Sequence, residues 1–164
     1  MDKGYKVYDK HVAFWGSQLS NFYPCSFELY GHTWKSSEQC FMARKAGYFG
    51  DDETYNKILS TNTPEEAKKL GRQVKGFVDE EWAVVRENIM YDIVYEKFAQ
   101  NKNLRDFLLS EEFKNKIFVE GSPFDGVWGV KIDYRNDIID DESNWNGTNL
   151  LGKVLEKVRL NLRH

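Results

Sequence analysis

The sequence has few of the residues that mark a disulfide-stabilised fold, a metal site or a membrane protein. Its 164 residues include two cysteines, Cys25 and Cys40, and three histidines, which are spaced neither as a CxxC pair nor as a zinc-binding set. We therefore expect no disulfide framework, no metal and no cofactor. The longest apolar runs fall far below the ~20 residues of a membrane helix, and the first residues lead into no signal-peptide core. We expect a cytoplasmic protein with no membrane partner.

An excess of basic residues is also absent, since the formal net charge is −3. Such an excess usually marks a protein that binds DNA or RNA electrostatically, although a local basic face stays open. The sequence has no GxxxxGK[ST] phosphate loop, no GxGxxG after a strand, no GxSxG elbow and no HExxH. The common nucleotide-hydrolase, dehydrogenase and serine-hydrolase functions therefore lack support.

The residues that are present indicate a globular chain able to build a core. Hydrophobic residues make up 41% of the sequence and aromatic residues 15%, and no repeat, low-complexity tract or Pro/Ser-rich linker divides it. Chains of about 100–200 residues commonly form one domain. We therefore expect residues 1–164 to form a single domain.

Local signals predict small β elements near the amino terminus and helices after them. Residues 26–34 favour a hairpin that turns at Gly31. Ser36 and Gln39 fit a capping box, which predicts a helix over about 37–46. Thr63 followed by proline predicts a second, short helix that runs through Leu70.

Apolar periodicity predicts the remaining helices. Trp82, Ile89 and Ile93 belong to a stripe that recurs every three or four residues, so the longest helix should run from after Asp79 to about Asn101. We expect a short helix over 104–109, an extended segment over 117–120 and a last helix over about 149–162, with Arg159 among its polar positions. The chain is therefore predicted to be mainly helical.

Asn21 and Phe22 lie in a polar and aromatic loop that ends in proline. Packing in a core or hairpin is the more common role of such aromatic residues. The functional alternative is a platform for a planar ring, to whose edge the Asn21 amide would offer both a donor and an acceptor.

Glu38 and Lys45 are seven residues apart on the predicted helix over 37–46, which places them on one face nearly two turns apart. Their charged groups could converge on one ligand. Glu38 could instead only compensate the helix dipole, and both could be solvated charges on an outer face. The spacing leaves these alternatives open.

Asp125 and Trp128 occur in a loop where glycines and a proline flank an acid and an indole. In an ordinary turn Asp125 would bond its own backbone and Trp128 would fill the core. A site for a ribosylated base is the alternative, because a carboxylate can bind sugar hydroxyls while an indole stacks on the base.

These segments in this order resemble the NADAR, or YbiA-like, family, and the resemblance covers nearly the whole chain. The motifs are Leu19-Ser20-Asn21-Phe22-Tyr23-Pro24, Trp34-Lys35-Ser36-Ser37-Glu38-Gln39, Ala43-Arg44-Lys45, Pro64-Glu65-Glu66-Ala67-Lys68-Lys69-Leu70-Gly71-Arg72, Trp82 with Arg86 and Met90, Lys97-Phe98, Glu120-Gly121-Ser122-Pro123-Phe124-Asp125, Trp128-Gly129 and Asn149-Leu150-Leu151-Gly152. Several ordered motifs together are far more specific than any one of them.

The resemblance implies a mainly helical orthogonal bundle with small β elements, and it implies N-glycosidase chemistry. Family members are associated with hydrolysis of phosphoribosylated pyrimidine intermediates of riboflavin synthesis, and others with removal of ADP-ribose from guanine. The expected partner is therefore a small ribosylated nucleotide or an ADP-ribosylated nucleic acid. This chain departs from the family pattern at Gln39, where His is frequent, at Gly121, where Ala is frequent, and at Lys131, where a second Gly is frequent.

N-glycosidic cleavage needs a carboxylate near the ribose C1 and a proton source near the leaving base. We assign Glu38 to C1 or to its attacking water, and Asp125 to the ribose hydroxyls or to a share of the acid–base role. Lys45 offers an alternative route through a Schiff base. The substrate-binding candidates are the aromatic residues Phe22, Trp34 and Trp128, the amide of Asn21, and Arg72 and Arg86 as weaker phosphate ligands. The rival hypothesis is a binding module for a nucleotide or ADP-ribose that uses the same residues without turnover.

Overall fold

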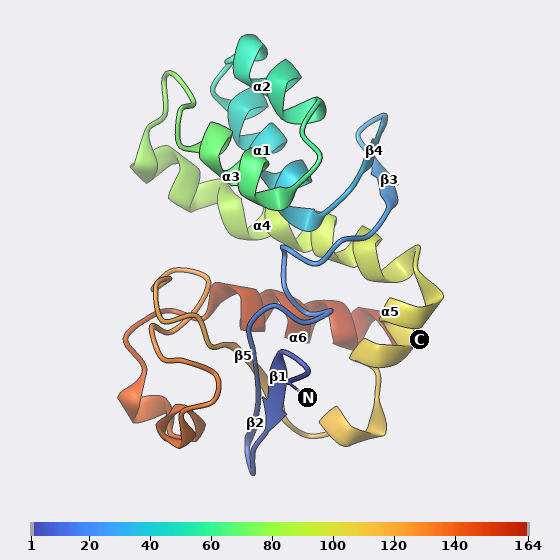
Figure 1. Ribbon diagram of the computed structural model, residues 1–164, viewed down its shortest axis with the longest axis vertical. Coiled ribbons are helices and arrows are strands. Elements are labelled where there is room, and N and C mark those ends of the chain that lie inside the picture. The colour runs from blue at the N-terminus through green and yellow to red at the C-terminus, as the bar shows by residue number, and fades with distance from the viewer. Residues whose placement is uncertain (1, 164) are drawn as a thin grey trace. The chain divides into compact units, whose positions relative to one another are not determined.

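The chain forms two compact units. Residues 21–101 make up one unit, and the segments before residue 21 and after residue 101 make up the other. The computed structural model describes residues 2–163, which contain six α-helices and five short strands (Figure 1). This confirms the mainly helical fold with small strands. The orthogonal arrangement of the helices and the single domain over residues 1–164 stay predictions.

The unit of residues 21–101 is a hairpin followed by four helices. The strands β3 (Phe27–Leu29) and β4 (His32–Trp34) pair antiparallel, as predicted. The helices are α1 (Ser37–Tyr48), α2 (Asp52–Leu59), α3 (Pro64–Gly71) and α4 (Asp79–Ala99). Helix α1 packs against the other three helices, so it is the central element of this unit. Helix α2 was not predicted, because its short sequence shows no long apolar stripe.

Of the two hydrogen bonds in the predicted capping box, only one forms at the start of α1. Ser36 Oγ accepts a hydrogen bond from Gln39 N at 3.0 Å, as a capping box requires. The Gln39 Oε1 accepts from Lys35 N at 2.8 Å, one residue before the expected donor. The Gln39 Nε2 donates to Ile58 O at 3.1 Å, so this side chain fastens the start of α1 to the end of α2. Fixing this position matters because Glu38 lies in the same turn.

Helix α4 buries Trp82 and Ile93, as its stripe predicted, and leaves Ile89 half-buried. It also buries Lys97, whose side chain contacts the rings of Tyr23 and Phe98. Burial lowers the pKa of Lys97 to about 8, because a charged amine is disfavoured away from water. The sequence pattern gave no sign that this polar residue would be internal.

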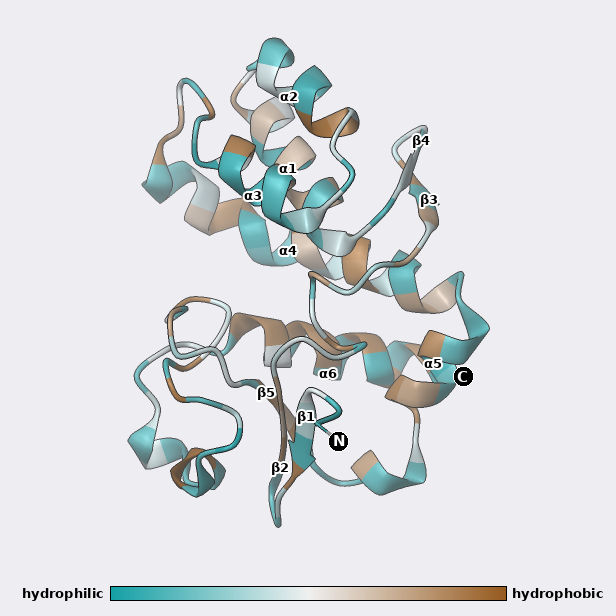
Figure 2. Cartoon of the chain, viewed as in Figure 1, coloured by the Kyte–Doolittle hydropathy of each residue, from teal (hydrophilic) through white to brown (hydrophobic). Residues whose placement is uncertain are grey.

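The other unit is built on a three-stranded mixed sheet in the order β1 (Tyr5–Val7), β2 (His11–Phe14), β5 (Ile117–Glu120). Strands β1 and β2 pair antiparallel, whereas β2 and β5 pair parallel across more than a hundred residues of sequence. Helix α5 (Lys102–Leu108) leads towards β5, and α6 (Leu150–Leu162) packs on it. Figure 2 shows hydrophobic residues concentrated along β5 and α6.

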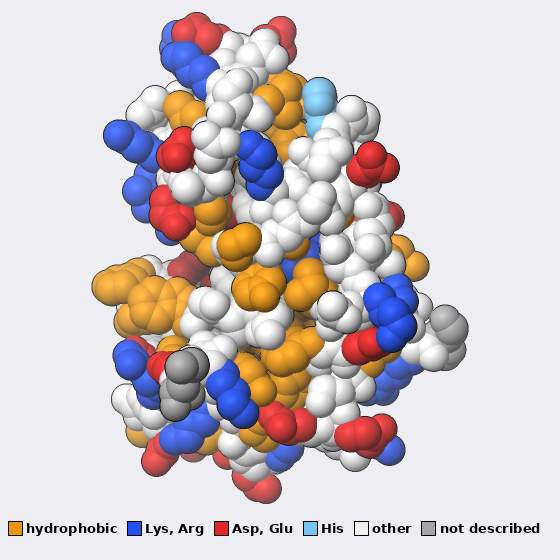
Figure 3. All heavy atoms as spheres, turned by 45° about the vertical axis from the view of Figure 1, so that its right-hand side comes forward, with side chains coloured by type: hydrophobic (Ala, Val, Ile, Leu, Met, Phe, Trp, Pro, Cys, Tyr) orange, Lys and Arg blue, Asp and Glu red, His pale blue; other side chains and the backbone are white. Residues whose placement is uncertain are grey.

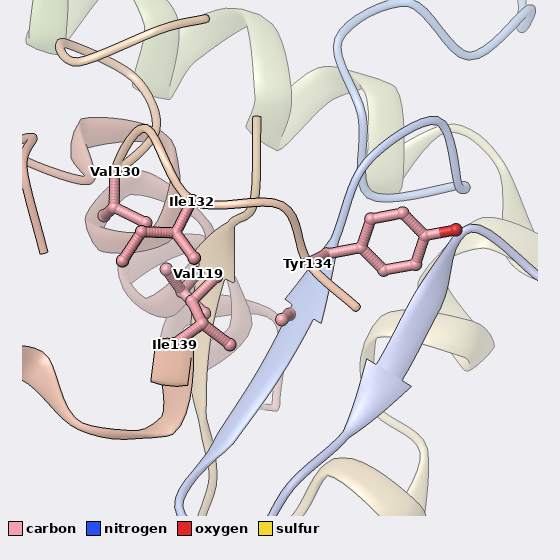
Figure 4. Packing of buried hydrophobic residues seen from close by; sticks show 6 residues of the cluster. Val119, Val130, Ile132, Tyr134 and Ile139 are labelled. Carbon is pink, nitrogen blue, oxygen red and sulfur yellow. The ribbon is translucent and has the colours of Figure 1, made fainter. Parts of the chain in front are cut away.

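A small apolar cluster supports the segment after β5. Figure 4 shows side chains from β5 and from this segment packed together, and the cluster consists of Ala13, Val119, Val130, Ile132, Tyr134 and Ile139. The Tyr134 hydroxyl donates to the Asp2 carboxylate, so this ring reaches from the apolar cluster to a polar group. The cluster therefore anchors both sides of the loop that carries Asp125.

Arg159 is internal, although its place in the helical pattern predicted a polar surface position. Its guanidinium donates to Phe113 O at 3.0 Å and to Lys116 O, and it lies over the Phe118 ring at 4.3 Å. These two backbone carbonyls, together with the Glu156 carboxylate that pairs with the guanidinium, compensate the charge of the buried side chain. The surface prediction for Arg159 was wrong, because periodicity cannot identify carbonyls supplied by a distant segment.

Two further findings concern the part of the chain that the structure describes. No helix over residues 2–163 is long and apolar enough to cross a membrane. Within the same residues, no three His, Cys, Asp or Glu side chains are grouped so that they could hold a metal ion.

Two helical glycines should respond in opposite directions to alanine. A Cβ on Gly152 in α6 would lie 2.1 Å from Phe118 O, so Gly152→Ala should destabilise the protein by roughly 1–3 kcal/mol through overpacking. A Cβ on Gly47 in α1 would meet only Tyr55, at 3.7 Å. Gly47→Ala should therefore stabilise by about 0.4–1 kcal/mol, because alanine favours helix. Urea unfolding of both variants checks this, and equal signs would contradict it.

Candidate functional site

The candidate site residues divide between the two units. The unit of residues 21–101 contains seven of them, namely Asn21, Phe22, Trp34, Glu38, Lys45, Arg72 and Arg86, and the other unit contains Asp125 and Trp128. Each group is described within its own unit. The first group surrounds α1, which supplies both Glu38 and Lys45.

Glu38 lies in the first turn of α1 and is 8% exposed, so it is not a solvated charge on an outer face. Its backbone N–H donates to Asn21 O at 2.9 Å. This bond ties the polar loop before β3 to the start of the helix. The first motif and the second are therefore adjacent in space, as a shared site requires.

Asn21 is 7% exposed, and no described residue hydrogen-bonds its side-chain oxygen Oδ1. A buried acceptor without a partner costs about 1–3 kcal/mol, so proteins seldom keep one unless water or a ligand satisfies it. The neighbouring Ser37 Oγ is likewise buried and has no partner within the described residues. The start of α1 therefore offers two unused polar atoms beside Glu38.

Lys45 is half-buried near the end of α1, and its Nζ lies 4.3 Å from the centre of the Phe77 ring. The pKa of Lys45 is lowered from its ordinary value of 10.5, chiefly because burial removes water from the ammonium. The carboxylates of Glu38 and Asp79 raise this pKa, and Arg72 lowers it. Burial outweighs the two carboxylates. The lowered pKa increases the fraction of Lys45 that is a neutral amine at a given pH.

Phe77 and Asp79 are neighbours of Lys45 that the motifs did not identify. Both are exposed, and they lie in and after the turn between α3 and α4. The sequence marks this turn by Gly76. In the structure this glycine has φ of +79°, a conformation that other residues adopt at a cost in free energy. Nothing in the spacing placed this turn beside α1.

The two aromatic candidates in this unit differ in their surroundings. Trp34 is 1% exposed, and its indole N–H donates to Leu29 O at 2.8 Å. It therefore packs as a core residue of the hairpin, and its stacking role stays a prediction. Phe22 is half-buried, with Lys68 Nζ 5.5 Å from its ring centre. This arrangement leaves part of the Phe22 ring accessible to a ligand.

The two arginine candidates lie on different helices. Arg72 is an exposed residue at the end of α3, and its charge acts on Lys45. Arg86 is half-buried on α4, and its Nε has no hydrogen-bond partner among the described residues. Both can still accept an anion in this arrangement, since guanidinium binds phosphate well. Their phosphate roles stay predictions.

In the other unit, Asp125 bonds the backbone of its own loop. Its Oδ1 accepts from Val127 N at 2.8 Å and from Trp128 N at 2.9 Å. This is the ordinary turn considered above, and it uses one of the two carboxylate oxygens. Asp125 and Trp128 are both half-buried. The bond from Trp128 N to the Asp125 carboxylate keeps the two residues next to one another in the turn.

The same loop accounts for two departures from the family pattern. A Cβ on Gly121 would lie 2.4 Å from the Tyr134 Cα, so alanine would not fit here without a shift. Lys131 has φ of +58°, a left-handed conformation that favours glycine. The Lys131 side chain packs against Gly126, because a Cβ added at Gly126 would lie 2.9 Å from the Lys131 Cε. The lysine therefore lies against the loop that carries Asp125.

A separate hollow of about 450 Å³ occurs in this unit, away from these candidates. Within it, the buried His11 bonds Asp140 Oδ1 at 2.9 Å through Nδ1 and Glu142 Oε1 at 3.3 Å through Nε2. These contacts join β2 to two short 3-10 helices, Asp137–Asp140 and Glu142–Asn144. We assign this hollow a structural role.

Residues 11–163 match the NADAR domain family. An N-glycosidase of Acanthamoeba polyphaga mimivirus is 36% identical, aligned over 92% of this chain and 95% of its own length. A riboflavin biosynthesis protein of Vibrio vulnificus is 34% identical over 88% of this chain, which spans 35% of that longer protein. The NMR structure of the E. coli protein YbiA matches with a TM-score of 0.75 and 27% identity, over 98% of this chain and 89% of that one.

The pKa of Lys45 should be measurably below 10.5 and should respond to its neighbours with known signs. Glu38→Gln should lower it further, because a carboxylate that stabilises the ammonium is lost, whereas Arg72→Gln should raise it. NMR titration of ¹³C-labelled lysine, with Lys45→Arg to assign the signal, measures each value. A Lys45 pKa at or above 10.5, or a rise in Glu38→Gln, would contradict this electrostatic account.

Proposed function

Because this chain belongs to the NADAR family and is an N-glycosidase, a hydrolase of N-glycosyl bonds, we propose that it cleaves a ribosylated base or amine beside α1. Two substrate classes fit the proposal. One is a phosphoribosylated aminopyrimidine of riboflavin synthesis, which the name of the Vibrio vulnificus relative supports. The other is ADP-ribose attached to guanine, free or in nucleic acid. A metabolite substrate would accord with the predicted cytoplasmic location.

The observation that carries the proposal is the lowered pKa of Lys45 on the same helix as the buried Glu38. A solvent-exposed lysine near these two carboxylates would keep or raise its pKa, so the lowered pKa of Lys45 reports its desolvation. Desolvation that outweighs this attraction is typical of a lysine used as a base or nucleophile. Active sites commonly combine burial of a titratable group with charged neighbours in this way.

Glu38 has the first role in the direct route. Cleavage of the glycosidic bond builds positive charge on C1 and on the ring oxygen of the ribose. We assign the Glu38 carboxylate to stabilise that charge or to take a proton from the attacking water. The water oxygen bonds to C1 as the C–N bond breaks. The base leaves with a proton, so one water is consumed in each turnover.

Lys45 offers a covalent route to the same products. The ribosylamine ring opens to an imine, and the neutral Lys45 amine adds to C1. The substrate amine then leaves with a proton, and a new imine joins C1 to Lys45. Water hydrolyses this imine, which frees the sugar and restores the lysine. Glu38 would carry the protons in these steps.

The other candidates have proposed supporting roles. Asn21 binds the edge of the base through its unused buried Oδ1, and Phe22 and Trp128 are surfaces for the ring. Asp125 binds ribose hydroxyls or shares the proton transfer with the oxygen that its turn leaves available. Arg72 and Arg86 contact phosphate. Trp34 supports the site from the core.

Incubation of the protein with each ribosylated substrate, followed by mass spectrometry, tests the function. Release of free base or amine with uptake of one water is the expected result. Saturable binding without release would instead support the non-catalytic binding module and would contradict the assignment of turnover.

Glu38→Gln should reduce kcat by about 10²–10⁴, the usual contribution of a general acid–base group. The amide has the same shape, and loss of a charge in the first turn of a helix costs about 0.3–2 kcal/mol, so the fold should persist. Glu65→Gln is the matched control, because Glu65 is an exposed first-turn acid of α3. Turnover of Glu38→Gln within about twofold of Glu65→Gln would remove Glu38 from the mechanism.

Borohydride added during turnover should trap a ribosyl adduct on Lys45 if the covalent route operates, because it reduces the imine. Lys45→Arg should then lose activity despite its charge, since a guanidinium cannot form the imine. Lys69→Arg, on the exposed side of α3, is the control. An active Lys45→Arg variant with no trapped adduct would eliminate the covalent route and leave water attack assisted by Glu38.

A further inference from the structure

Lys131 has an unfavourable backbone conformation in the loop that carries Asp125. Its φ of +58° lies in the left-handed region, which glycine adopts freely and a residue with a Cβ adopts at a cost in free energy. Residues held in such conformations occur preferentially at functional sites, where the surrounding structure fixes them. The backbone at this position would be better served by glycine, so the role of Lys131 must be sought in its side chain.

Hydrogen bonds from neighbouring segments fix this backbone. Lys131 N donates to Asp125 O at 3.2 Å, which links the lysine directly to the acid of the loop. The residue before it, Val130, donates through its N–H to Glu120 O at 3.2 Å and accepts from Asn146 N at 3.0 Å. The position of Lys131 relative to Asp125 is therefore set before any ligand binds.

The aliphatic part of the Lys131 side chain packs along the same loop. A Cβ added at Gly126, the residue after Asp125, would lie 2.9 Å from the Lys131 Cε and 3.4 Å from its Cδ. Lysine commonly packs its methylene groups on a surface in this way while its ammonium stays in water. The ammonium follows the Cε, so it is presented on the loop that carries Asp125.

The Lys131 ammonium is exposed, and within residues 2–163 it forms no ion pair or hydrogen bond. Other cations of the same unit do have partners, as when Lys6 Nζ pairs with Asp137 Oδ1 at 2.9 Å. The acid nearest to Lys131 along the chain, Asp133, accepts from the Arg135 guanidinium through both oxygens, at 3.0 and 2.9 Å. The charge of Lys131 is therefore available to an anion from outside the protein.

A phosphorylated sugar gives this charge a use. A carboxylate such as Asp125 can accept hydrogen bonds from ribose hydroxyls, but it repels a phosphate carried by the same sugar. A lysine fixed on the same loop offsets that repulsion, because an ammonium pairs with phosphate as a compact charge. In both substrate classes considered above, the reacting ribose carries phosphate on its C5.

We propose that Lys131 determines specificity for a phosphate on C5 of the reacting ribose, with which its ammonium pairs while Asp125 binds hydroxyls of the same sugar. The inference rests on the proposed N-glycosidase function and deepens it, because it makes a phosphorylated ribose the preferred substrate over an unphosphorylated one. The phosphate is a monoester in a phosphoribosyl substrate and part of a diphosphate in an ADP-ribosyl substrate, and the experiment distinguishes these two sources.

Equilibrium titration with ribose 5-phosphate and with ADP-ribose tests the contact without requiring turnover. Lys131→Gln should weaken binding about fivefold, the upper effect of an exposed ion pair, and added salt should reduce this difference. Lys131→Arg keeps the charge and should stay within about twofold of the wild type. Lys153→Gln, which changes an exposed lysine of α6, is the matched control.

The pattern of loss identifies the source of the phosphate. Weaker binding of ribose 5-phosphate alone assigns Lys131 to a phosphate monoester, and weaker binding of ADP-ribose alone assigns it to a diphosphate. Losses for both ligands assign it to the C5 phosphate that they share. Affinities of Lys131→Gln that match those of Lys153→Gln for both ligands would overturn the proposal.

Lys131→Gly separates recognition of phosphate from a structural role. Glycine relieves the left-handed backbone, so this variant should unfold in urea at a midpoint no lower than that of the wild type. It should nevertheless weaken ligand binding as much as Lys131→Gln does. A lower midpoint with unchanged affinity would show that the lysine serves packing on Gly126, and this would overturn the proposal.

Turnover of a ribosylated aminopyrimidine, with and without its 5-phosphate, supplies the second measurement. Lys131→Gln should raise KM about fivefold for the phosphorylated substrate and less than twofold for the other, with kcat unchanged. Equal effects on the two substrates would refute the specificity role and leave the N-glycosidase function standing. Binding that depends on both phosphate and Lys131, with no cleavage of either substrate, would keep the contact and refute that function.

Discussion

Burial of the Lys45 amine beside two carboxylates is the constraint on which the proposed chemistry depends. Water would hold this amine charged, and Glu38 and Asp79 act in the same direction, so its pKa is lowered chiefly by desolvation, to which the charge of Arg72 adds. Helix α1 achieves this because three helices of its unit pack around it. Glu38 on the same helix is buried and Lys45 is half-buried, and the two charges are near enough to interact.

The hydrogen bonds around the start of α1 explain why this arrangement is fixed. Ser36 caps the helix, Gln39 joins it to the end of α2, and Glu38 N bonds the loop of Asn21. The capped start of α1 is therefore bonded to two other segments, the end of α2 and the loop of Asn21. Glutamine can donate and accept at once, so Gln39 meets two backbone groups.

In the other unit, the loop that carries Asp125 is held on a small sheet. Helix α6 approaches β5 so closely that Gly152 is required next to Phe118 O. The Asn149 side chain adds bonds to Glu120 N and Phe118 O, and this joins the start of α6 to the strand that precedes the loop. Asp125 and Trp128 are thus carried on a turn with both ends anchored. On the face shown in Figure 3, acidic and basic side chains are interspersed.

The sequence by itself determined the hairpin, the helices α1, α3, α4 and α6, and the order of motifs that marks the family, because caps, turns and apolar periodicity act over a few residues. It also selected Glu38 and Lys45 as neighbours on one helix. Only the tertiary structure decided that Glu38 is buried, that Lys45 is desolvated and that Phe77 lies beside it. The parallel pairing of β2 with β5 and the burial of Arg159 were decided in the same way. In each case the partner is distant in the chain, and burial and pKa depend on that partner rather than on local spacing.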